Sequence, residues 1–464
     1  MADAQAKFLT GSLMRHITVM ALTSSVGLMA VFAVDFIDMI FIAMLGKAEL
    51  AAAIGYAGAI LFFTSSFGIG MAIAGGALVA RALGEGDHEK AQRQATNVLI
   101  YGAVFGAVFA AVVWVNLPPI VALVGASGET ADLAVAYLRV IIPSLPLLLV
   151  GMVGGAILRA HGDARRSMMA TIVGAIVNAV LDPILIFGLG LELQGAAWAS
   201  VAARAAIGVT ALVPIVRYYG GFGRPNFASV LPDLRPVAII AFPAILTQLA
   251  TPIGQAYVTR AMSTYGEDAV AGMAIVGRLT PVAFAVIFAL SGAIGPIIGQ
   301  NYGARQSERV RGAFRDGVIF TGAVVVGMSA LLFALRPALQ ILFDLDGQAR
   351  ALVFLFAGPL SLLWFFNGLI FVSNAACNNM GHPFYSTWVN WGRHTVGTVP
   401  FVLLFSAWFG ASGVLIGQAV GGVLFAGLAV WLALRIMDDG GGDTGAFDSI
   451  DKQARVFSWL HRNR

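Results

Sequence analysis

The sequence has few charged residues and almost no cysteine. Only 11% of its 464 residues are charged, 59% are hydrophobic, and a single cysteine, Cys377, is present. One cysteine excludes both a disulfide framework and a cysteine-based metal site. The six histidines form no HExxH pair, and neither a Gly-x-Ser-x-Gly nor a P-loop motif occurs. The residues therefore support neither zinc hydrolysis nor ATP-driven work, and we expect no enzyme activity and no bound metal or cofactor.

What the sequence has instead is a series of long apolar segments between short charged loops. Each segment of about 20 residues is long enough to cross a hydrocarbon core of roughly 30 Å as a helix. We expect an all-α polytopic membrane protein with twelve transmembrane helices in contact with the lipid bilayer. The predicted spans are 17–45, 50–82, 94–117, 130–158, 166–190, 194–218, 237–264, 269–300, 314–336, 350–379, 384–408 and 410–436.

The 28 lysines and arginines are unevenly distributed over the loops. Twenty of them fall at the amino terminus, in every second loop, or from Arg435 onward, and only four fall in the intervening loops. By the positive-inside rule both termini are cytoplasmic, and we expect a multi-pass protein of a bacterial inner membrane. The net charge of +4 then reflects topology, and no nucleic-acid partner is expected.

Two pairs of similar segments indicate an internal repeat. LGEGDHEKAQRQ from Leu83 resembles YGARQSERVRGA from Tyr302, and LRAHGDARRS from Leu158 resembles CNNMGHPFYS from Cys377, both at a separation of 219 residues. Because each half has an even number of spans, the halves share one orientation and are related by a pseudo-two-fold axis along the membrane normal. The predicted divisions are an N-terminal six-helix lobe (1–218), a cytoplasmic linker (219–236), a C-terminal six-helix lobe (237–437) and a cytoplasmic tail (438–464).

An acid in the fifth predicted span is the first candidate for a functional residue. Asp182 lies in NAVLDPILIF, within an apolar segment of membrane length. A carboxylate at the centre of such a helix costs roughly 2.5–3.5 kcal/mol on insertion scales and usually faces a bundle interior or a watery cavity. Asn178 lies one turn earlier on the same face, and Pro183 frees a backbone carbonyl and kinks the helix. The pattern predicts a polar site at Asn178 and Asp182.

The first predicted span contributes a second pair of acids. Asp35 and Asp38 are three residues apart and lie on one side of the helix. The alternative is that one of them, Asp35 above all, is simply hydrated near the outer membrane interface. Two carboxylates close together in a medium of low dielectric constant cannot both stay ionised cheaply, so one is expected to carry a proton near neutral pH. Taking up and releasing that proton would bias the two lobes between inward-open and outward-open states.

The second half has no acids at the matching positions and carries amides and aromatic rings instead. Rings offer cation–π and apolar contacts, and amides orient a ligand, so this composition favours an amphipathic cargo. The alternative is that the amides hold helices together and the tryptophans anchor at membrane interfaces. The candidate substrate-binding residues are Asn367, Asn374, Trp364, Phe366, Asn378 and Gln255.

Over residues 10–437 the sequence resembles the multidrug and toxic compound extrusion (MATE) transporters. The Asp38 segment, the LGEGDHEKA loop, the RAHGD turn and NAVLDPILIF all occur where that family has them, and the branch it looks most like is the DNA-damage-inducible protein F type. The resemblance implies a cation site at Asp38, Asn178 and Asp182, completed by the hydroxyl of Ser200. Some relatives have a tyrosine one turn before the first-helix acid, whereas this chain has Val34.

The resemblance further implies an antiporter that exports small amphipathic, often cationic, organic compounds and is driven by inward flow of H⁺ or Na⁺. We favour H⁺, because the acids of helices 7 and 10 that mark the sodium-coupled branch are missing; hard oxygens of the amino-terminal site could instead ligate Na⁺. We expect the protein to act as a monomer.

A flippase for a lipid-linked precursor is the alternative to export. It would require cationic residues in the cavity, and Arg204, Arg260, Arg278 and Arg393 keep it open. A passive channel is disfavoured, since the acids are confined to one half.

Overall fold

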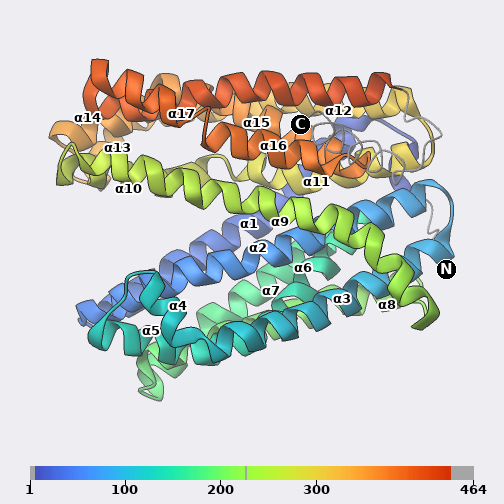
Figure 1. Cartoon of the computed structure of the whole chain (residues 1–464), viewed down its shortest axis with the longest axis horizontal. Coiled ribbons are helices and arrows are strands. Elements are labelled where there is room, and N and C mark those ends of the chain that lie inside the picture. Colours follow the sequence, from blue (N-terminus) through green and yellow to red (C-terminus); the bar gives the residue numbers. More distant parts are fainter. Residues whose placement is uncertain (1–5, 225–226, 440–464) are drawn as a thin grey trace, which may run out of the picture. The chain divides into compact units, whose positions relative to one another are not determined.

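The computed structural model describes residues 6–224 and 227–439, which are almost entirely helical (Figure 1). The first half contains η1 (Lys7–Leu9), α1 (Leu13–Met44), α2 (Ala48–Gly84), α3 (His88–Val115), α4 (Leu117–Leu123), α5 (Gly128–Ile141), η2 (Ile142–Ser144), α6 (Leu145–Ala160), α7 (Ala164–Pro183), η3 (Ile184–Gly188) and α8 (Glu192–Tyr218). The second half contains α9 (Phe227–Ser263), α10 (Glu267–Ala283), α11 (Ala285–Gly303), α12 (Ser307–Ala334), α13 (Arg336–Leu342), α14 (Gly347–Leu355), η4 (Phe356–Leu360), α15 (Trp364–Asn379), α16 (Pro383–His394) and α17 (Val399–Asp438).

The number of membrane crossings agrees with the sequence. Within the described residues ten helices are long and apolar enough to cross a membrane, and the bent pair Gly347–Leu360 and Trp364–Asn379 adds another. One of the ten, Pro383–Asp438, is 56 residues long and folds back on itself at Gly410, where φ is 59° and ψ is −137°. Counted as two crossings, it brings the total to twelve, and the predicted all-α fold is confirmed.

The predicted span 269–300 is broken rather than continuous. It is divided at Phe284 into α10 and α11, and only α11 is long enough to be a span by itself. Pro281 lies one turn before this break, where its ring removes a backbone hydrogen bond. The short helices α4 and α13, which connect consecutive spans, were not predicted; they begin 219 residues apart and so repeat between the halves.

The chain forms two compact units. The first, which we call the N-lobe, comprises Met1–Lys7, Leu22–Leu83 and Asp87–Ile245; the second, the C-lobe, comprises Phe8–Ala21, Gly84–Gly86 and Leu246–Arg464. The division therefore falls inside α1 and inside α9, the first long helix of each half. The stretch 219–236, predicted as a linker loop, becomes helical from Phe227. Of the predicted tail, all but Asp438 and Asp439 lies outside the described residues.

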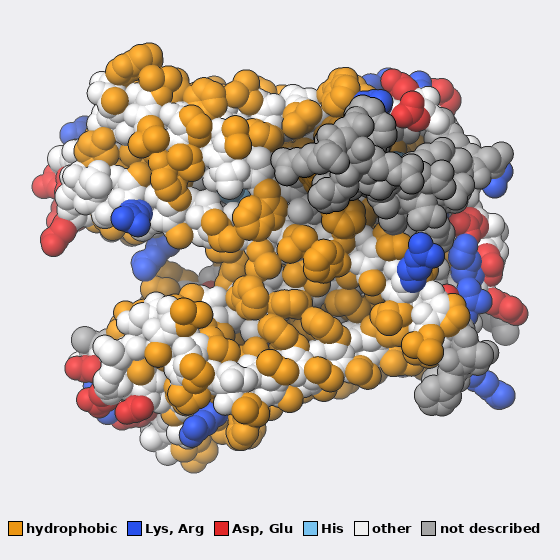
Figure 2. All heavy atoms as spheres, viewed as in Figure 1, with side chains coloured by type: hydrophobic (Ala, Val, Ile, Leu, Met, Phe, Trp, Pro, Cys, Tyr) orange, Lys and Arg blue, Asp and Glu red, His pale blue; other side chains and the backbone are white. Residues whose placement is uncertain are grey.

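Small residues set the spacing of the helices around the N-lobe interior. At Gly174 of α7, an added Cβ would lie 2.3 Å from the side chain of Ile207 in α8. At Gly195, near the start of α8, it would lie 2.7 Å from the backbone of Leu185 in the turn after α7. The two helices therefore approach closely along their length, as small residues permit in membrane proteins. Figure 2 shows hydrophobic side chains along the flanks of the helices and charged side chains gathered near their ends.

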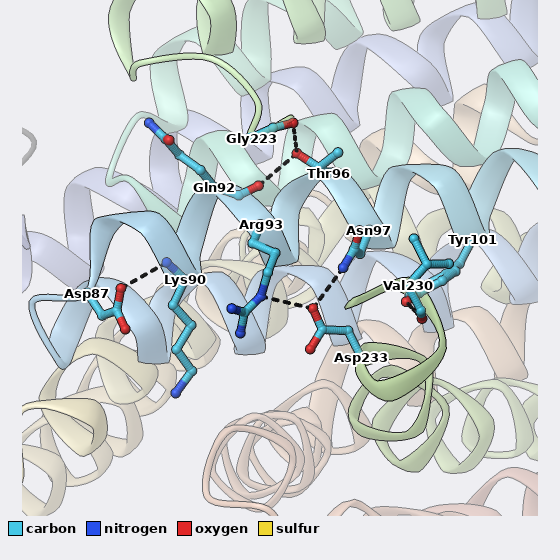
Figure 3. A network of polar contacts seen from close by, with 10 residues as sticks. All are labelled: Asp87, Lys90, Gln92, Arg93, Thr96, Asn97, Tyr101, Gly223, Val230 and Asp233. Atoms are coloured by element: carbon cyan, nitrogen blue, oxygen red, sulfur yellow. Dashed lines mark hydrogen bonds and ion pairs between the residues drawn. The ribbon is translucent and has the colours of Figure 1, made fainter. Parts of the chain in front are cut away.

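The first turns of α9 are attached to α3 of the N-lobe by a polar network (Figure 3). The carboxylate of Asp233 accepts hydrogen bonds from Arg93 Nε at 3.1 Å and from Asn97 Nδ2 at 2.7 Å. One turn further along α3, the Tyr101 hydroxyl donates to the carbonyl oxygen of Val230. These bonds fix the beginning of α9 in the same lobe as α3.

The segment before α1 is held in the C-lobe in a comparable way. The backbone N–H of Phe8 donates to Gln300 Oε1 at 2.9 Å, and its carbonyl accepts from Arg309 Nη2 at 2.8 Å and Asn301 Nδ2 at 3.2 Å. The ring of Phe8 is buried. Each lobe thus holds, by hydrogen bonds, the beginning of a helix that it shares with the other lobe: α9 in the N-lobe and α1 in the C-lobe.

Candidate cation and substrate sites

The structure brings together two of the predicted acids inside the N-lobe. Asp182 of α7 is 0% exposed, and the carboxyl group of Asp38 of α1 lies within hydrogen-bonding reach of it. No N–H or hydroxyl group among the described residues donates to either oxygen of Asp182. Because two ionised carboxylates are both acceptors, a hydrogen bond between them requires that one holds a proton. The pair can therefore store one proton.

The acids have neighbours that the sequence did not reveal. The buried hydroxyl of Tyr137 in α5 hydrogen-bonds with Ser200 of α8 and interacts electrostatically with both acids. Arg204, one turn after Ser200, donates from Nη1 to Ser144 Oγ at 2.9 Å and to the carbonyl oxygen of Ile141 at 3.2 Å. The sequence signal for these neighbours was a tyrosine and an arginine within otherwise apolar spans. Their spacing did not indicate that they contact α1 or α7.

The remaining predicted N-lobe residues take different positions. Asn178 is buried one turn before Asp182, and its side-chain nitrogen has no hydrogen-bond partner among the described residues. Asp35 is exposed on the surface of α1 and interacts with Asp38 only through its charge. The site therefore consists of Asp38 and Asp182, with Asn178 and Ser200 beside them and Asp35 at its edge.

The backbone next to Asp182 is irregular. α7 ends at Pro183 and continues as one π-helical turn, Ile184–Gly188. Such turns leave carbonyl groups without their usual partners and occur frequently at functional sites. The helix therefore changes type after the acid, and the bend predicted at Pro183 stays a prediction.

The C-lobe contains a buried basic group in place of acids. Arg393 is 9% exposed and His394 is 7% exposed at the end of α16. Arg393 Nη1 donates to Asn367 Oδ1 of α15 at 2.6 Å, and its Nη2 lies 2.7 Å from His394 Nε2. The helix then stops, and α17 begins only at Val399. Of the predicted substrate-binding residues, Asn367 is the one that contacts this group.

The other five predicted substrate-binding residues do not form one cluster. The ring of Trp364 stacks on Phe284 with centroids 4.8 Å apart, and Phe366 contacts Phe365 edge-on. Gln255 is exposed and accepts a hydrogen bond from Gln418 at 3.3 Å.

Asn374 and Asn378 lie further along α15, and both contact Ser386. The Ser386 hydroxyl donates to the side chain of Asn378 at 3.1 Å and to the carbonyl oxygen of Asn374 at 3.4 Å.

A cavity of about 500 Å³ lies beside the loop that joins α6 to α7 in the N-lobe, with His88, His161, Arg217 and Tyr219 among its lining residues. Asp163 accepts hydrogen bonds from the Tyr219 hydroxyl at 2.6 Å and from Arg166 Nη1 at 2.5 Å. Burial alone would raise the pKa of Asp163, but these hydrogen bonds outweigh it and lower the pKa below its usual value. The cavity is bordered by a charged contact that fixes the loop.

His161 stacks on Tyr219 in the same place, with ring centroids 4.5 Å apart. Burial above all, and the nearby His88 to a smaller extent, lower the pKa of His161 to about 4. Burial also raises the pKa of Tyr219 to about 12. Both rings are consequently neutral at physiological pH.

Comparison with known proteins supports the repeat. The family model MatE matches the chain twice, over residues 24–184 and 243–403, and the two matches begin 219 residues apart. The first match contains Asp38, Asn178 and Asp182. The chain belongs to the MatE family.

Relatives of known description cover nearly the whole MatE chain. A "FAD transporter" of Shewanella oneidensis is 28% identical over 90% of this chain and 94% of its own. A "probable multidrug resistance protein NorM" of Pseudomonas aeruginosa is 30% identical over 88% and 86%. A crystal structure of the Vibrio cholerae MATE transporter VcmN has a TM-score of 0.86 at 22% identity, covering 91% of this chain and 96% of that one. The last similarity concerns the fold alone.

Membership of the family decides the general class of the protein. It is a multi-pass membrane transporter and not an enzyme, as the absence of catalytic motifs led us to expect.

Proposed function

We propose that this MatE protein is a proton-coupled antiporter that exports amphipathic organic compounds across a bacterial inner membrane by alternating access, with both termini in the cytoplasm. The observation that carries the proposal is the contact, inside one lobe, between the half-buried Asp38 and the fully buried Asp182, to which no N–H or hydroxyl group of the described residues donates. Relatives named for multidrug export and for FAD transport support the export of organic compounds.

The coupling step follows from the charge of this acid pair. When both carboxylates are ionised, their repulsion in a low-dielectric interior is costly, and uptake of one proton relieves it. Asp38 lies on α1, which belongs to both lobes, so a change in its contact with α7 acts on a helix that both lobes share. The membrane potential supplies about 2.3 kcal/mol per charge per 100 mV, enough to shift such an equilibrium more than tenfold.

Na⁺ is the second candidate for the coupling ion. Carboxylate, hydroxyl and amide oxygens at Asp182, Ser200 and Asn178 are hard ligands of the kind that alkali and alkaline-earth cations prefer. We favour H⁺ because a proton on one of the two acids allows the hydrogen bond between Asp38 and Asp182.

The test is dye transport in proteoliposomes under an imposed pH gradient, an imposed sodium gradient, or neither, with rhodamine 123 as the cargo. For the wild type we expect movement driven by the pH gradient. Asp38→Asn and Asp182→Asn should each reduce it to the level of empty liposomes, because neither can release a proton. Asp132→Asn removes an exposed acid at the start of α5 and is the matched control.

The other outcomes are equally informative. Asp35→Asn is expected to have a smaller effect than Asp38→Asn, since the Asp35 carboxylate is exposed. Transport driven only by sodium would reverse the choice of ion. Dye movement that needs no gradient, or wild-type rates in both acid variants, would contradict the proposal and favour the flippase.

A further inference from the structure

The arginine inside the C-lobe has no acidic partner within the part of the chain that the structure describes. The guanidinium of Arg393 stays charged at any physiological pH, and it is 9% exposed. Among the described residues it forms no ion pair, and neither α15 nor α16 contains an Asp or Glu. A charge buried without a counter-charge is strongly unfavourable, and such residues in membrane segments usually mark a functional site.

The neighbours of Arg393 satisfy hydrogen bonds but supply no negative charge. Asn367 Oδ1 accepts from Nη1, and His394 Nε2 faces Nη2 as an acceptor. If Nε2 accepts, the proton of the neutral ring is on Nδ1, and that buried nitrogen has no hydrogen-bond partner among the described residues. Nδ1 faces Gly254 of α9, where an added Cβ would lie 2.3 Å from it, so the guanidinium is the group of this cluster that can bind an anion.

The position of the cluster along the chain also suits a ligand. Arg393 is ten residues after Pro383, which at 1.5 Å per residue is about 15 Å along α16, or about half of a hydrocarbon core of roughly 30 Å. The helix is interrupted directly afterwards, between His394 and Val399. Interrupted helices near the bilayer midplane form the substrate and ion sites of many transporters.

The C-lobe elements around the cluster offer a polar surface next to it. Gly254 of α9 packs directly against His394; an added Cβ there would lie 2.3 Å from the ring. The next residue, Gln255, is exposed, although it lies well inside a membrane-length helix, and Asn367 is half-buried. Exposed amides at this depth indicate a hydrated cavity rather than lipid.

From these observations we propose that Arg393, together with His394 and Asn367, binds the anionic group of the exported compound, so that the substrates include amphipathic organic acids with a carboxylate or phosphate. This inference rests on the proposed export function and specifies its substrate class. The apolar body of such a compound would be accommodated by the aromatic and amide side chains of the same lobe, and its acidic group would provide the counter-charge that Arg393 lacks.

The test uses two dyes of similar ring system and opposite charge, fluorescein and rhodamine 123. Binding of each to the purified full-length protein in phosphatidylcholine nanodiscs is measured by fluorescence anisotropy. For Arg393→Gln we expect the affinity for fluorescein, relative to that for rhodamine 123, to fall about tenfold or more, the usual effect of losing a hydrogen bond to a charged group. Arg393→Lys should restore part of the preference, because it retains the charge.

A second variant separates anion binding from folding. Asn367→Asp places a carboxylate beside Arg393, so the guanidinium gains an internal partner and the protein should fold while losing fluorescein binding to the same extent. Arg350→Gln, which removes an exposed charge at the end of the C-lobe, is the matched control and should leave the ratio unchanged.

Three results would overturn the inference: no measurable binding of fluorescein by the wild type, an equal loss for both dyes in Arg393→Gln, or full fluorescein binding in Asn367→Asp. Competition by phosphatidylglycerol nanodiscs would assign the site to a lipid headgroup and also overturn the assignment to a substrate. Failure of the export proposal is distinguishable, because it would show as gradient-independent movement of rhodamine 123 while the anion preference persisted.

Discussion

The two lobes interrupt the same helix of their repeat and place opposite charges beside the interruption. In the N-lobe α7 ends in a π-helical turn directly after Asp182, which faces Asp38. In the C-lobe the corresponding helix stops after Arg393 and His394 and resumes at Val399. The two halves share the break in the backbone, and in our proposals the side chains beside each break decide what the lobe binds. A duplicated scaffold can thus hold an ion site in one half and a substrate site in the other.

The largest expected effect comes from disturbing the packing against the interruption in the C-lobe. Gly421 of α17 packs against the break, and an added Cβ would lie 1.5 Å from the carbonyl oxygen of Gly397. Since backbone cannot move aside as a flexible side chain can, Gly421→Ala should destabilise the protein by about 3 kcal/mol or more. The measurement is thermal unfolding followed by reaction of the buried Cys377, the only cysteine, with a thiol-reactive dye.

The control for this substitution lies on the same helix. Gly427→Ala places its Cβ in open space, so it should leave the unfolding midpoint unchanged or raise it slightly, by up to about 1 kcal/mol from helix propensity. Equal midpoints for the two variants would show that the close contact at Gly421 does not maintain the break.

A smaller effect of opposite sign is expected at Arg393. Replacing the unpaired guanidinium by an apolar side chain of similar volume, Arg393→Met, removes the cost of burying a charge and should stabilise the protein by about 1 kcal/mol, while anion binding is lost. A higher unfolding midpoint together with loss of anion binding would show that Arg393 serves binding rather than stability. A fall in the unfolding midpoint would instead show that Arg393 serves to hold α15 and α16 together.

The last prediction concerns the pH dependence of stability at the loop between α6 and α7 of the N-lobe. The pKa of His161 is about 4 in the folded protein against 6.5 for the free side chain. Below pH 6.5 the unfolded chain therefore binds a proton that the folded protein does not, and stability should decline between pH 6.5 and about 4. No contribution from His161 is expected above pH 6.5.

The variant His161→Phe isolates this contribution. It retains a ring against Tyr219 and removes the titrating group, so the unfolding midpoint should depend less steeply on pH than in the wild type between pH 6.5 and 4. Identical slopes for the two proteins would show that His161 is already protonated in the fold.

The sequence predicted the helices better than their partners. Apolar length identified all twelve crossings, and the Asn178 to Pro183 motif identified the backbone irregularity beside Asp182, because both are local properties of the chain. Tyr137 and Arg204 were missed as members of that site, since their contacts join helices far apart in sequence. The pairing of Arg393 with Asn367 was missed for the same reason.

The beginning of α9 was predicted as a loop because PNFASVLPDLRP contains three prolines and several polar residues. Pro232 and Pro236 lie past the first turn of α9, and each removes a backbone hydrogen bond of the helix. The tertiary contacts of Asp233 with Arg93 and Asn97 then stabilise a segment whose composition alone favours a turn.

Because α1 and α9 each belong to both lobes, no single cut in the gene separates the lobes cleanly. A cut in the connection before Phe227 would leave the attachment site on α3 in one fragment and Asp233 in the other. A cut after Ser263 would keep that network intact but give the first fragment the part of α9 that packs in the C-lobe. Neither fragment would therefore be a complete lobe, and co-expressed halves should assemble only by exchanging these segments, as in a domain-swapped pair.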